Sequence, residues 1–384
     1  MRTELTQEEI LRYSRQIIIP EVGIHGQEKL KKASALIVGT GGLGSPVSLY
    51  LAAAGVGRIG VVDFDNIELS NLHRQIIHGT NHIGMAKVKS ARDHMLSLNP
   101  DIEVIPYEEG FTSKNALRIA KNYQIIIDGS DNFPTRYLTN DVCVLLGIPN
   151  VYGSVFRFDG QASVFYAREG PCYRCLFPEP PSPGMVPSCA DGGVLGILPG
   201  TIGTIQATEA LKYLLGIGSS LVGRLLLFNA LDMSFEFVRL KKNLECKICG
   251  TNPEIHELID YDEFCGFPNR IETDHVKNDL LEIDVEELAK KFEGDDNIFL
   301  LDVREPHELE ISSIKGAKLI PLGQLASRID EVARDREIIV FCKTGNRSRQ
   351  ALEILSRAGF TNVKNLKGGI NAWVKTIDRT QPLY

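Results

Sequence analysis

The sequence predicts an α/β protein made of two successive domains, each built on a buried parallel sheet. Apolar runs rich in Ile and Val, at 33–38 and 125–128, are typical of buried parallel strands, and each ends in a glycine-containing loop. The same pattern begins again near residue 298, after a polar stretch. With 384 residues, the chain is long enough for about two or three domains, each with its own core.

The amino-acid composition of the chain limits the kinds of partner and environment that we expect for it. The net charge is −7 and no run is rich in Lys and Arg, so we do not expect nucleic acid to bind. The first residues are polar and acidic, unlike a signal peptide, and no apolar run is long enough to span a bilayer. We therefore expect a cytoplasmic protein without membrane association. Eight cysteines in such a chain indicate metal binding or catalysis rather than disulfides.

Residues 6–17 are predicted to form the first helix, because Thr6 and Glu9 have the spacing of a capping box. Arg15 lies on this helix, and its own surroundings predict only a solvated side chain. The strand at 33–38 then leads into Gly39-x-Gly41-x-x-Gly44, and residues 45–54 are predicted to be helical. Glycines let backbone N–H groups approach a phosphate at the positive end of a helix. We call residues 39–44 the glycine loop.

A second strand at 58–62 ends in Asp63, which is placed to bind a ribose hydroxyl. Up to this point a nicotinamide or flavin Rossmann domain explains the pattern equally well. The segment Ser-Asn-Leu-His-Arg-Gln at 70–75 then adds polar donors and a cation, and Lys87 adds another cation. Arg74 or Lys87 alone would be read as a solvated charge. Together, beside a glycine loop, they favour a triphosphate over a dinucleotide.

The strand at 125–128 leads directly to Asp131 and Asn132. A carboxylate at this edge of the sheet can hold Mg²⁺ against phosphates. Alternatively, Asp131 or Asn132 caps the helix that starts near Pro134. Residues 149–165 alternate in a way that predicts strands extending the sheet, and Cys143 lies in an apolar run typical of a core.

Two C-x-x-C pairs follow, and their four thiolates suit a closed tetrahedral Zn²⁺ site. The separation is wider than in a zinc finger, so we expect a structural ion that joins distant segments. A redox C-x-x-C needs only one pair, which argues against that alternative. The predicted ligands are Cys172, Cys175, Cys246 and Cys249.

Between the pairs lies a proline-rich loop, 177–190, which carries Cys189 outside both of them. A thiol on such a loop near a nucleotide site suggests covalent capture of an activated acyl group. An amphipathic helix is predicted at 201–215. The polar stretch after the second pair reads as a linker, and Cys265 within it has no evident partner. We therefore predict domains at 1–250 and 279–384, joined by a linker at 251–278.

The second domain is predicted to begin with a helix near 283–288. Strands follow at 298–301 and 337–341, and the latter leads into Cys342 and a helix over 349–358. Backbone N–H groups and a helix N-terminus behind Cys342 would stabilise an anion at its sulfur. A tyrosine-phosphatase loop is the competing interpretation. The four residues between Cys342 and Arg347 are one too few for that loop, and the smaller ring suits a sulfane sulfur, so Cys342 is interpreted as a persulfide carrier.

These motifs carry a family resemblance along most of the chain. Residues 1–250 resemble the molybdopterin-synthase adenylyltransferases and their thiamine-pathway relatives, which are bacterial cousins of ubiquitin-activating enzymes. Residues from about 280 onward resemble a rhodanese domain, through 301–305 and 342–348. The fusion is similar to the sulfurylating fusions of actinobacteria and eukaryotes. The resemblance implies a Rossmann-like activating-enzyme domain with structural zinc, followed by a smaller α/β rhodanese domain. Many rhodaneses have Gly-His where Ser312 and Ser313 stand here.

The resemblance also implies roles for individual residues. Arg15 would be a catalytic cation supplied across a homodimer interface, and Asp131 would bind Mg²⁺ beside Asn132. Cys189 would either form a thioester with a carrier protein or resolve an acyl disulfide, and Cys342 would bear the persulfide. ATP would be held by Gly41, Gly42, Asp63, Ser70, Asn71, Leu72, His73, Arg74 and Lys87.

The implied reaction uses ATP to adenylylate the C-terminal glycine of a small ubiquitin-like sulfur-carrier protein ending in Gly-Gly. The Cys342 persulfide, filled by a donor such as a cysteine desulfurase or thiosulfate, would then give the carrier thiocarboxylate. Such carriers serve molybdopterin, thiamine, cysteine or tRNA thiolation. Two other functions stay open: a Rossmann oxidoreductase with an appended domain, and an activating enzyme for protein conjugation with the second domain as a docking module.

Overall fold

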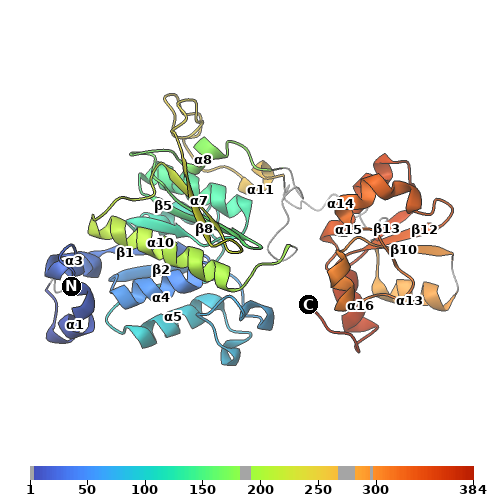
Figure 1. Cartoon of the computed structure of the whole chain (residues 1–384), viewed down its shortest axis with the longest axis horizontal. Coiled ribbons are helices and arrows are strands. Elements are labelled where there is room, and N and C mark those ends of the chain that lie inside the picture. Colours follow the sequence, from blue (N-terminus) through green and yellow to red (C-terminus); the bar gives the residue numbers. More distant parts are fainter. Residues whose placement is uncertain (1–3, 182–191, 267–281, 295–296) are drawn as a thin grey trace. The chain divides into compact units, whose positions relative to one another are not determined.

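The computed structural model describes residues 4–181, 192–266, 282–294 and 297–384 (Figure 1). The chain divides into two compact units, Met1–Phe267 and Pro268–Tyr384. None of the helices in the described ranges has the length and apolar composition needed to span a membrane.

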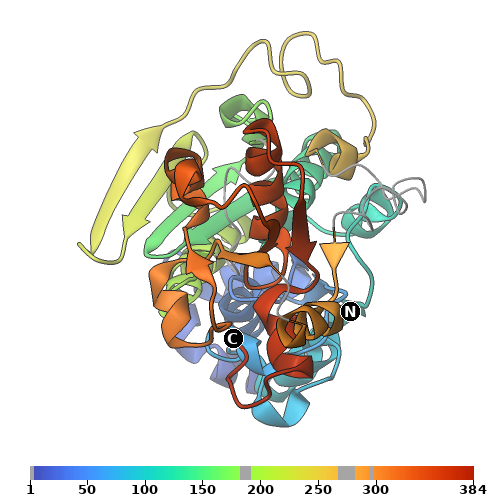
Figure 2. The same cartoon turned by 90° about the vertical axis from the view of Figure 1, so that its right-hand side faces the viewer.

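The described part of the first unit holds an eight-stranded sheet with the order β3-β2-β1-β4-β5-β6-β7-β8. The first five strands of that order pair in parallel, and β5 to β8 pair antiparallel. The β7–β8 hairpin, yellow in Figure 2, forms one edge of the sheet. The strands are β1 (Ser34–Val38), β2 (Arg58–Val62), β3 (Glu103–Tyr107), β4 (Ile125–Asp128), β5 (Asn150–Phe156), β6 (Asp159–Phe165), β7 (Arg224–Asn229) and β8 (Ser234–Arg239).

Helices cover both faces of this sheet over strands β1 to β6, which are buried between two apolar cores, whereas β8 at the edge is largely exposed. The first core joins the sheet to α3 (Gly23–Lys32), α4 (Gly44–Ala54), α5 (Lys87–Leu98) and α10 (Ile197–Leu215). The second joins it to α6 (Ala116–Ala120), α7 (Phe133–Leu146), α8 (Tyr173–Leu176) and α11 (Tyr261–Phe264). Cys143 is buried in the second core, as its apolar run predicted.

The N-terminal helix differs from its prediction. The capping box of Thr6 and Glu9 is present, but the helix is split into α1 (Gln7–Arg12) and α2 (Ser14–Ile17). Tyr13, between them, is buried and its hydroxyl accepts a hydrogen bond from Asn99 Nδ2 at 2.8 Å. The helix is interrupted at Tyr13 because the side chain of this residue is held in the tertiary contact with Asn99.

The segment after the second C-x-x-C pair also differs. We predicted a linker from residue 251, yet the described residues up to 266 pack on the first unit. Tyr261 and Cys265 are buried in its second core, and the Tyr261 hydroxyl donates to Asp141 Oδ2 at 2.9 Å. Burial of these side chains extends the first unit well past residue 250.

The second unit is built on a parallel sheet with the order β11-β10-β12-β13-β9. Two apolar cores lie on its faces. Its described elements are β9 (Glu282–Ile283), α13 (Val285–Glu293), β10 (Ile298–Asp302), η4 (Pro306–Glu310), β11 (Lys318–Leu319), α14 (Leu322–Leu325), η5 (Ala326–Glu331), β12 (Glu337–Phe341), α15 (Asn346–Arg357), β13 (Val363–Leu366) and α16 (Gly369–Thr376).

Candidate functional sites

The glycine loop packs tightly between β1, β4 and α4. A Cβ atom at Gly44 would overlap the carbonyl oxygen of Gly39, and one at Gly129 would lie 2.8 Å from the same oxygen. Gly39 itself has φ +89°, a conformation that L side chains rarely adopt. These close approaches place the loop after β1 directly against the loop after β4.

Asp63, predicted to bind ribose, also organises the glycine loop from the end of β2. Its Oδ2 accepts hydrogen bonds from the backbone N and the Oγ1 of Thr40, at 2.8 and 3.0 Å. Its Oδ1 accepts from the backbone N of Asp65 at 3.0 Å. Sequence reasoning missed Thr40, whose hydroxyl contacts a residue at the end of the neighbouring strand, a pairing that no spacing rule specifies.

The 70–75 segment lies next to the glycine loop. A Cβ atom at Gly42 would be 3.7 Å from Arg74 Cγ, and one at Gly41 would be 3.6 Å from Gln75 Nε2. Arg74 Nη1 donates to the carbonyl oxygen of Ser70 at 3.0 Å and contacts His73 Nε2 at 2.8 Å. Asn71 Oδ1 accepts from the backbone N of Glu68, within the short helix η1 (Leu69–Asn71). The structure thus brings the predicted cation Arg74 beside Gly42.

Lys87 is the first residue of α5, and its side chain is 7 % exposed. Its Nζ donates to Asp65 Oδ2 at 2.8 Å, so the buried ammonium has a carboxylate partner. His78 links α5 to the glycine loop, because its Nδ1 lies 3.1 Å from Ser90 Oγ and its Nε2 lies 3.2 Å from the carbonyl oxygen of Thr40. Burial lowers the pKa of His78 to about 4, and the charge of Lys87 contributes to the shift.

Of the two residues, Asn132 takes the helix-capping role that the sequence left open between them. Asn132 caps α7, and its Oδ1 accepts from the backbone N of Thr135 at 2.9 Å. Asp131 is exposed, with its carboxylate available at the carboxyl end of β4. The preceding Asp128 is fully buried and accepts from Ser130 N and Oγ at 3.0 and 2.5 Å. Asp128 therefore fixes the loop that presents Asp131.

Two predicted catalytic residues are not brought to this edge by the described chain. Arg15 is exposed on α2 and its side chain forms no hydrogen bond or ion pair with the described residues, so the single chain leaves its role as a prediction. Cys189 lies outside the described residues.

The four cysteines predicted to bind zinc come together, although the two pairs are more than 70 residues apart. Their Sγ atoms all lie within 4.8 Å of one another, with 3.6 Å between Cys172 and Cys246 and 3.4 Å between Cys175 and Cys249. Zn–S bonds of about 2.3 Å in a tetrahedron place sulfurs about 3.8 Å apart. The spacing of this donor set therefore fits a zinc site with four cysteine ligands.

A buried ion pair holds the first cysteine pair in place. Arg174, between Cys172 and Cys175, donates from Nε and Nη2 to the two carboxylate oxygens of Asp141 on α7, each at 2.8 Å. Its guanidinium also lies over the rings of Tyr137 and Phe264, at 4.9 and 4.5 Å. Such a pair is costly to break, because one partner would remain as an uncompensated buried charge.

In the second unit, Cys342 lies in a tight loop between β12 and α15. The backbone N of Gly345 donates to its Sγ at 3.1 Å, and Ser348 Oγ lies 3.4 Å from the same atom. Gly345 has φ +105°, which turns its N–H toward the sulfur. Ser348 Oγ is in turn 2.6 Å from Asn365 Oδ1 on β13. Because the single hydroxyl proton of Ser348 goes to Asn365 Oδ1, the Gly345 N–H is left as the donor to Sγ, and such a donor suits a sulfur that carries negative charge.

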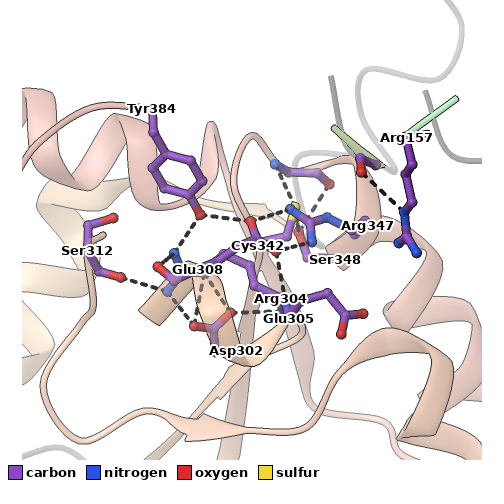
Figure 3. A network of polar contacts seen from close by, with 12 residues as sticks. Arg157, Asp302, Arg304, Glu305, Glu308, Ser312, Cys342, Arg347, Ser348 and Tyr384 are labelled. Atoms are coloured by element: carbon purple, nitrogen blue, oxygen red, sulfur yellow. Dashed lines mark hydrogen bonds and ion pairs between the residues drawn. The ribbon is translucent and has the colours of Figure 1, made fainter. Parts of the chain in front are cut away.

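Arg347, in the first turn of α15 directly after this loop, is held by Glu308 of η4 (Figure 3). Its Nη1 and Nη2 donate to Glu308 Oε2 and Oε1 at 2.6 and 2.8 Å. Burial opposes the charged form of Glu308, but the hydrogen bonds from Arg347, the Glu305 backbone and Tyr384 together lower its pKa to about 2. Sequence reasoning did not single out Glu308 or Tyr384, since neither lies in a motif.

Comparison with known families agrees with this geometry. The model of the ThiF family matches residues 13–248, which is more than half of the chain. The chain belongs to the ThiF family. A rhodanese-like domain model matches residues 284–376, and therefore covers the Cys342 loop. The Rossmann-like first unit and the smaller α/β second unit of this ThiF-family chain thus confirm the predicted fold class.

Full-length relatives share both domains. The chain is 45 % identical to the probable adenylyltransferase/sulfurtransferase MoeZ of Mycobacterium tuberculosis, over 99 % of this chain and 96 % of that protein. It is 43 % identical to the adenylyltransferase and sulfurtransferase MOCS3 of Culex quinquefasciatus, over 100 % and 91 % of the two chains. Both relatives therefore match this ThiF-family chain along almost its whole length.

Solved structures match the fold of the ThiF domain. The crystal structure of Escherichia coli MccB with ATP has a TM-score of 0.55 and 20 % sequence identity, and the match covers 62 % of this chain and 74 % of that one. MccB with MccA-N7isoASN matches with a TM-score of 0.56 and 21 % identity, over 62 % and 74 % of the two chains.

Proposed function

We propose that this chain activates a small ubiquitin-like sulfur-carrier protein and converts its C-terminal carboxylate to a thiocarboxylate. What supports the proposal is that Arg74 lies beside Gly42, that Asp65 joins Lys87 to the Asp63 that holds the glycine loop, and that Gly129, two residues before Asp131, packs against Gly39. The same chain holds Cys342 with a hydrogen bond from the Gly345 N–H to its sulfur. The naming of the relatives MoeZ and MOCS3 as adenylyltransferase and sulfurtransferase supports it.

The first step forms an acyl-adenylate. The carrier carboxylate attacks the α-phosphorus of ATP, the bond to the β-phosphate oxygen breaks, and pyrophosphate leaves. Negative charge grows on the oxygens between the α- and β-phosphates, where cations are most effective. Arg74 and Lys87 would supply positive charge there, and the N–H groups of the glycine loop at the start of α4 would bind phosphate oxygens. Asp63 would bind the ribose.

Two metal ions are proposed. Asp131 would hold Mg²⁺, because its exposed carboxylate follows β4 beside the glycine loop, and the ion would neutralise phosphate charge. Zinc would be held by the four cysteines, as their sulfur separations suit it, and would act structurally because four protein ligands leave no open position. A cation from a second copy, Arg15, would complete the ATP site of a homodimer.

The second step transfers sulfur. The outer sulfur of a Cys342 persulfide attacks the acyl carbon, AMP leaves, and an acyl disulfide joins Cys342 to the carrier. A thiolate, from Cys189 or a dithiol reductant, then attacks the inner sulfur and releases the carrier thiocarboxylate. The resulting disulfide is reduced by a second thiol. The Gly345 N–H would stabilise negative charge on the Cys342 sulfur.

The test measures both steps on the full chain, with ATP, Mg²⁺, thiosulfate and a candidate carrier ending in Gly-Gly. We expect carrier-dependent exchange of pyrophosphate into ATP, and a mass gain of the carrier that matches replacement of one oxygen by sulfur. Asp131→Ala should lose both signals. Cys342→Ser should keep the exchange and lose the thiocarboxylate. If Cys342→Ser still formed thiocarboxylate from thiosulfate, the second domain would be a docking module and the sulfur-transfer half of the proposal would be wrong.

A further inference from the structure

Tyr384 contacts the network that holds the Cys342 loop, although it lies 42 residues further along the sequence. Its hydroxyl donates to Glu308 Oε1 at 2.8 Å and accepts from Arg304 Nη1 at 2.7 Å (Figure 3). Its backbone carbonyl accepts from Asn371 Nδ2 at 3.1 Å. The residue is thus held at two points, and the hydroxyl contact can be removed while the backbone contact remains.

Glu308 connects this hydroxyl to the loop. Its Oε1 accepts from both Tyr384 and Arg347, while its Oε2 accepts from Arg347 and from the backbone N of Glu305 at 2.9 Å. The Glu308 side chain is 7 % exposed and that of Arg347 13 %. Both oxygens of this buried carboxylate accept hydrogen bonds. Loss of one donor therefore changes how strongly the carboxylate binds the remaining donors.

The chemistry of the neighbouring groups determines which atom donates in each hydrogen bond of the Tyr384 hydroxyl. Burial raises the pKa of Tyr384 above its ordinary value, and the hydrogen bond to Glu308 raises it further, so the phenol keeps its proton. Arg304 has no acceptor atom and can only donate. It is fully buried and binds Asp302 through Nε and Nη2. The Tyr384 hydroxyl must therefore accept from Arg304 and donate to Glu308.

The ring of Tyr384 reaches a second cation of the loop. Lys343 Nζ lies 4.9 Å from the ring centroid, within the range of a cation–π contact. Lys343 directly follows Cys342 in the loop, and Arg347 lies in the first turn of α15 just after it. Tyr384 therefore contacts one of these cations through its ring and the other through Glu308.

We infer that Tyr384 is a positioning residue for sulfur transfer at Cys342, holding Lys343 and Arg347 where an anionic sulfur donor meets the loop. The inference rests on the proposed persulfide role of Cys342. It assigns to Tyr384 a contribution to the binding of the donor, acting through the two cations and not through contact with the reacting sulfur.

The experiment uses the full chain with thiosulfate as donor and cyanide as acceptor. The Cys342 thiolate takes the outer sulfur of thiosulfate and releases sulfite, and cyanide then takes that sulfur as thiocyanate and restores the thiolate. Tyr384→Phe removes the hydroxyl but keeps the ring and the backbone contact. We expect it to raise KM for thiosulfate about three- to tenfold, the effect of one hydrogen bond, with kcat changed less than about twofold. Leu383→Ala, an exposed neighbour, should leave both unchanged.

A double-mutant cycle tests the route through Glu308. In a Glu308→Gln background, adding Tyr384→Phe should have little further effect on KM, because the acceptor charge is already gone. Fully additive effects would overturn the inference. An unchanged KM for thiosulfate in Tyr384→Phe would also overturn the inference. Changes in KM and kcat equal to those of Leu383→Ala would overturn it as well.

A second measurement does not depend on sulfur transfer. Backbone hydrogen exchange over residues 342–349 should be faster in Tyr384→Phe than in the unmodified chain and in Leu383→Ala, because the loop has lost part of its support. If the unmodified chain moved no sulfur, the proposed function would fail, and this comparison would still decide whether Tyr384 holds the loop in place. Unchanged exchange in Tyr384→Phe would overturn the inference alone, and pyrophosphate exchange into ATP should be the same in all these variants.

Discussion

Lys87 and Asp65 form an ion pair, 2.8 Å from Nζ to Oδ2, in which the lysine side chain is 7 % exposed and the carboxylate 51 %. Asp65 in turn donates its backbone N–H to Asp63, which holds Thr40 of the glycine loop. A buried ammonium needs a partner, and here the partner is the more accessible of the two groups. A triphosphate at the loop would offer Lys87 a stronger anion, with Asp65 free to turn toward water.

Replacing Lys87 should therefore disable adenylylation. We expect Lys87→Met to lower kcat for carrier-dependent pyrophosphate exchange by about 100-fold or more, the usual effect of losing one group that stabilises transition-state charge. Lys89→Met is the matched control, since Lys89 is on the same helix but 58 % exposed and paired with Glu108. Equal losses in the two variants would show that Lys87 has no special role.

The buried His78 predicts an acid-sensitive first unit. Its pKa is lowered in the folded state to about 4 from an ordinary value of 6.5, so the unfolded chain binds the proton more readily. The contribution of His78 to stability is therefore complete above pH 6.5 and falls as the pH drops from 6.5 to 4. The difference between these two pKa values corresponds to a contribution on the order of 3 kcal/mol.

Chemical unfolding of the first unit between pH 4 and 7 measures this dependence. His78→Asn should flatten it, whereas His25→Asn should not, because the His25 side chain is 96 % exposed. An unchanged slope in His78→Asn would assign the acid sensitivity to other groups.

The four-cysteine cluster predicts one tightly held zinc ion per chain. Cys175→Ser should lower the bound zinc measured by elemental analysis and destabilise the first unit by more than about 4 kcal/mol, as expected for loss of a structural metal. For a unit of this size the melting temperature should fall by about 8–16 °C. Cys265→Ala provides the control, because Cys265 is buried but outside the cluster. A full zinc content in Cys175→Ser would contradict the four-ligand assignment.

The parts of this molecule that can be predicted from its sequence are those that depend on short-range patterns. The apolar run before Gly39 and the spacing of its glycines predicted β1, the glycine loop and α4, and two C-x-x-C pairs predicted a cluster whose halves meet in space. These patterns work because backbone geometry and metal coordination impose local spacing.

The remaining features depend on contacts between residues far apart in sequence. Tyr13 interrupts a helix because it meets Asn99, and Tyr261 binds Asp141, which turned an expected linker into packed structure. Tyr384 reaches Arg304 across 80 residues. No periodicity or motif signals such pairings, because each depends on which side chains the completed fold brings together. The role proposed for Arg15 is harder still to predict from the sequence, because it depends on a contact with a second copy of the chain.

The mutual packing of Gly39, Gly44 and Gly129 limits how this chain can change over evolutionary time. A larger residue at any one of them meets main-chain atoms of another, and substituting a different side chain elsewhere does not move a carbonyl group out of the way. A compensatory mutation elsewhere therefore cannot make room for a side chain at these three positions. Genetic drift can change the helices around the loop, but Gly39, Gly44 and Gly129 must be inherited together by descendants of this sequence.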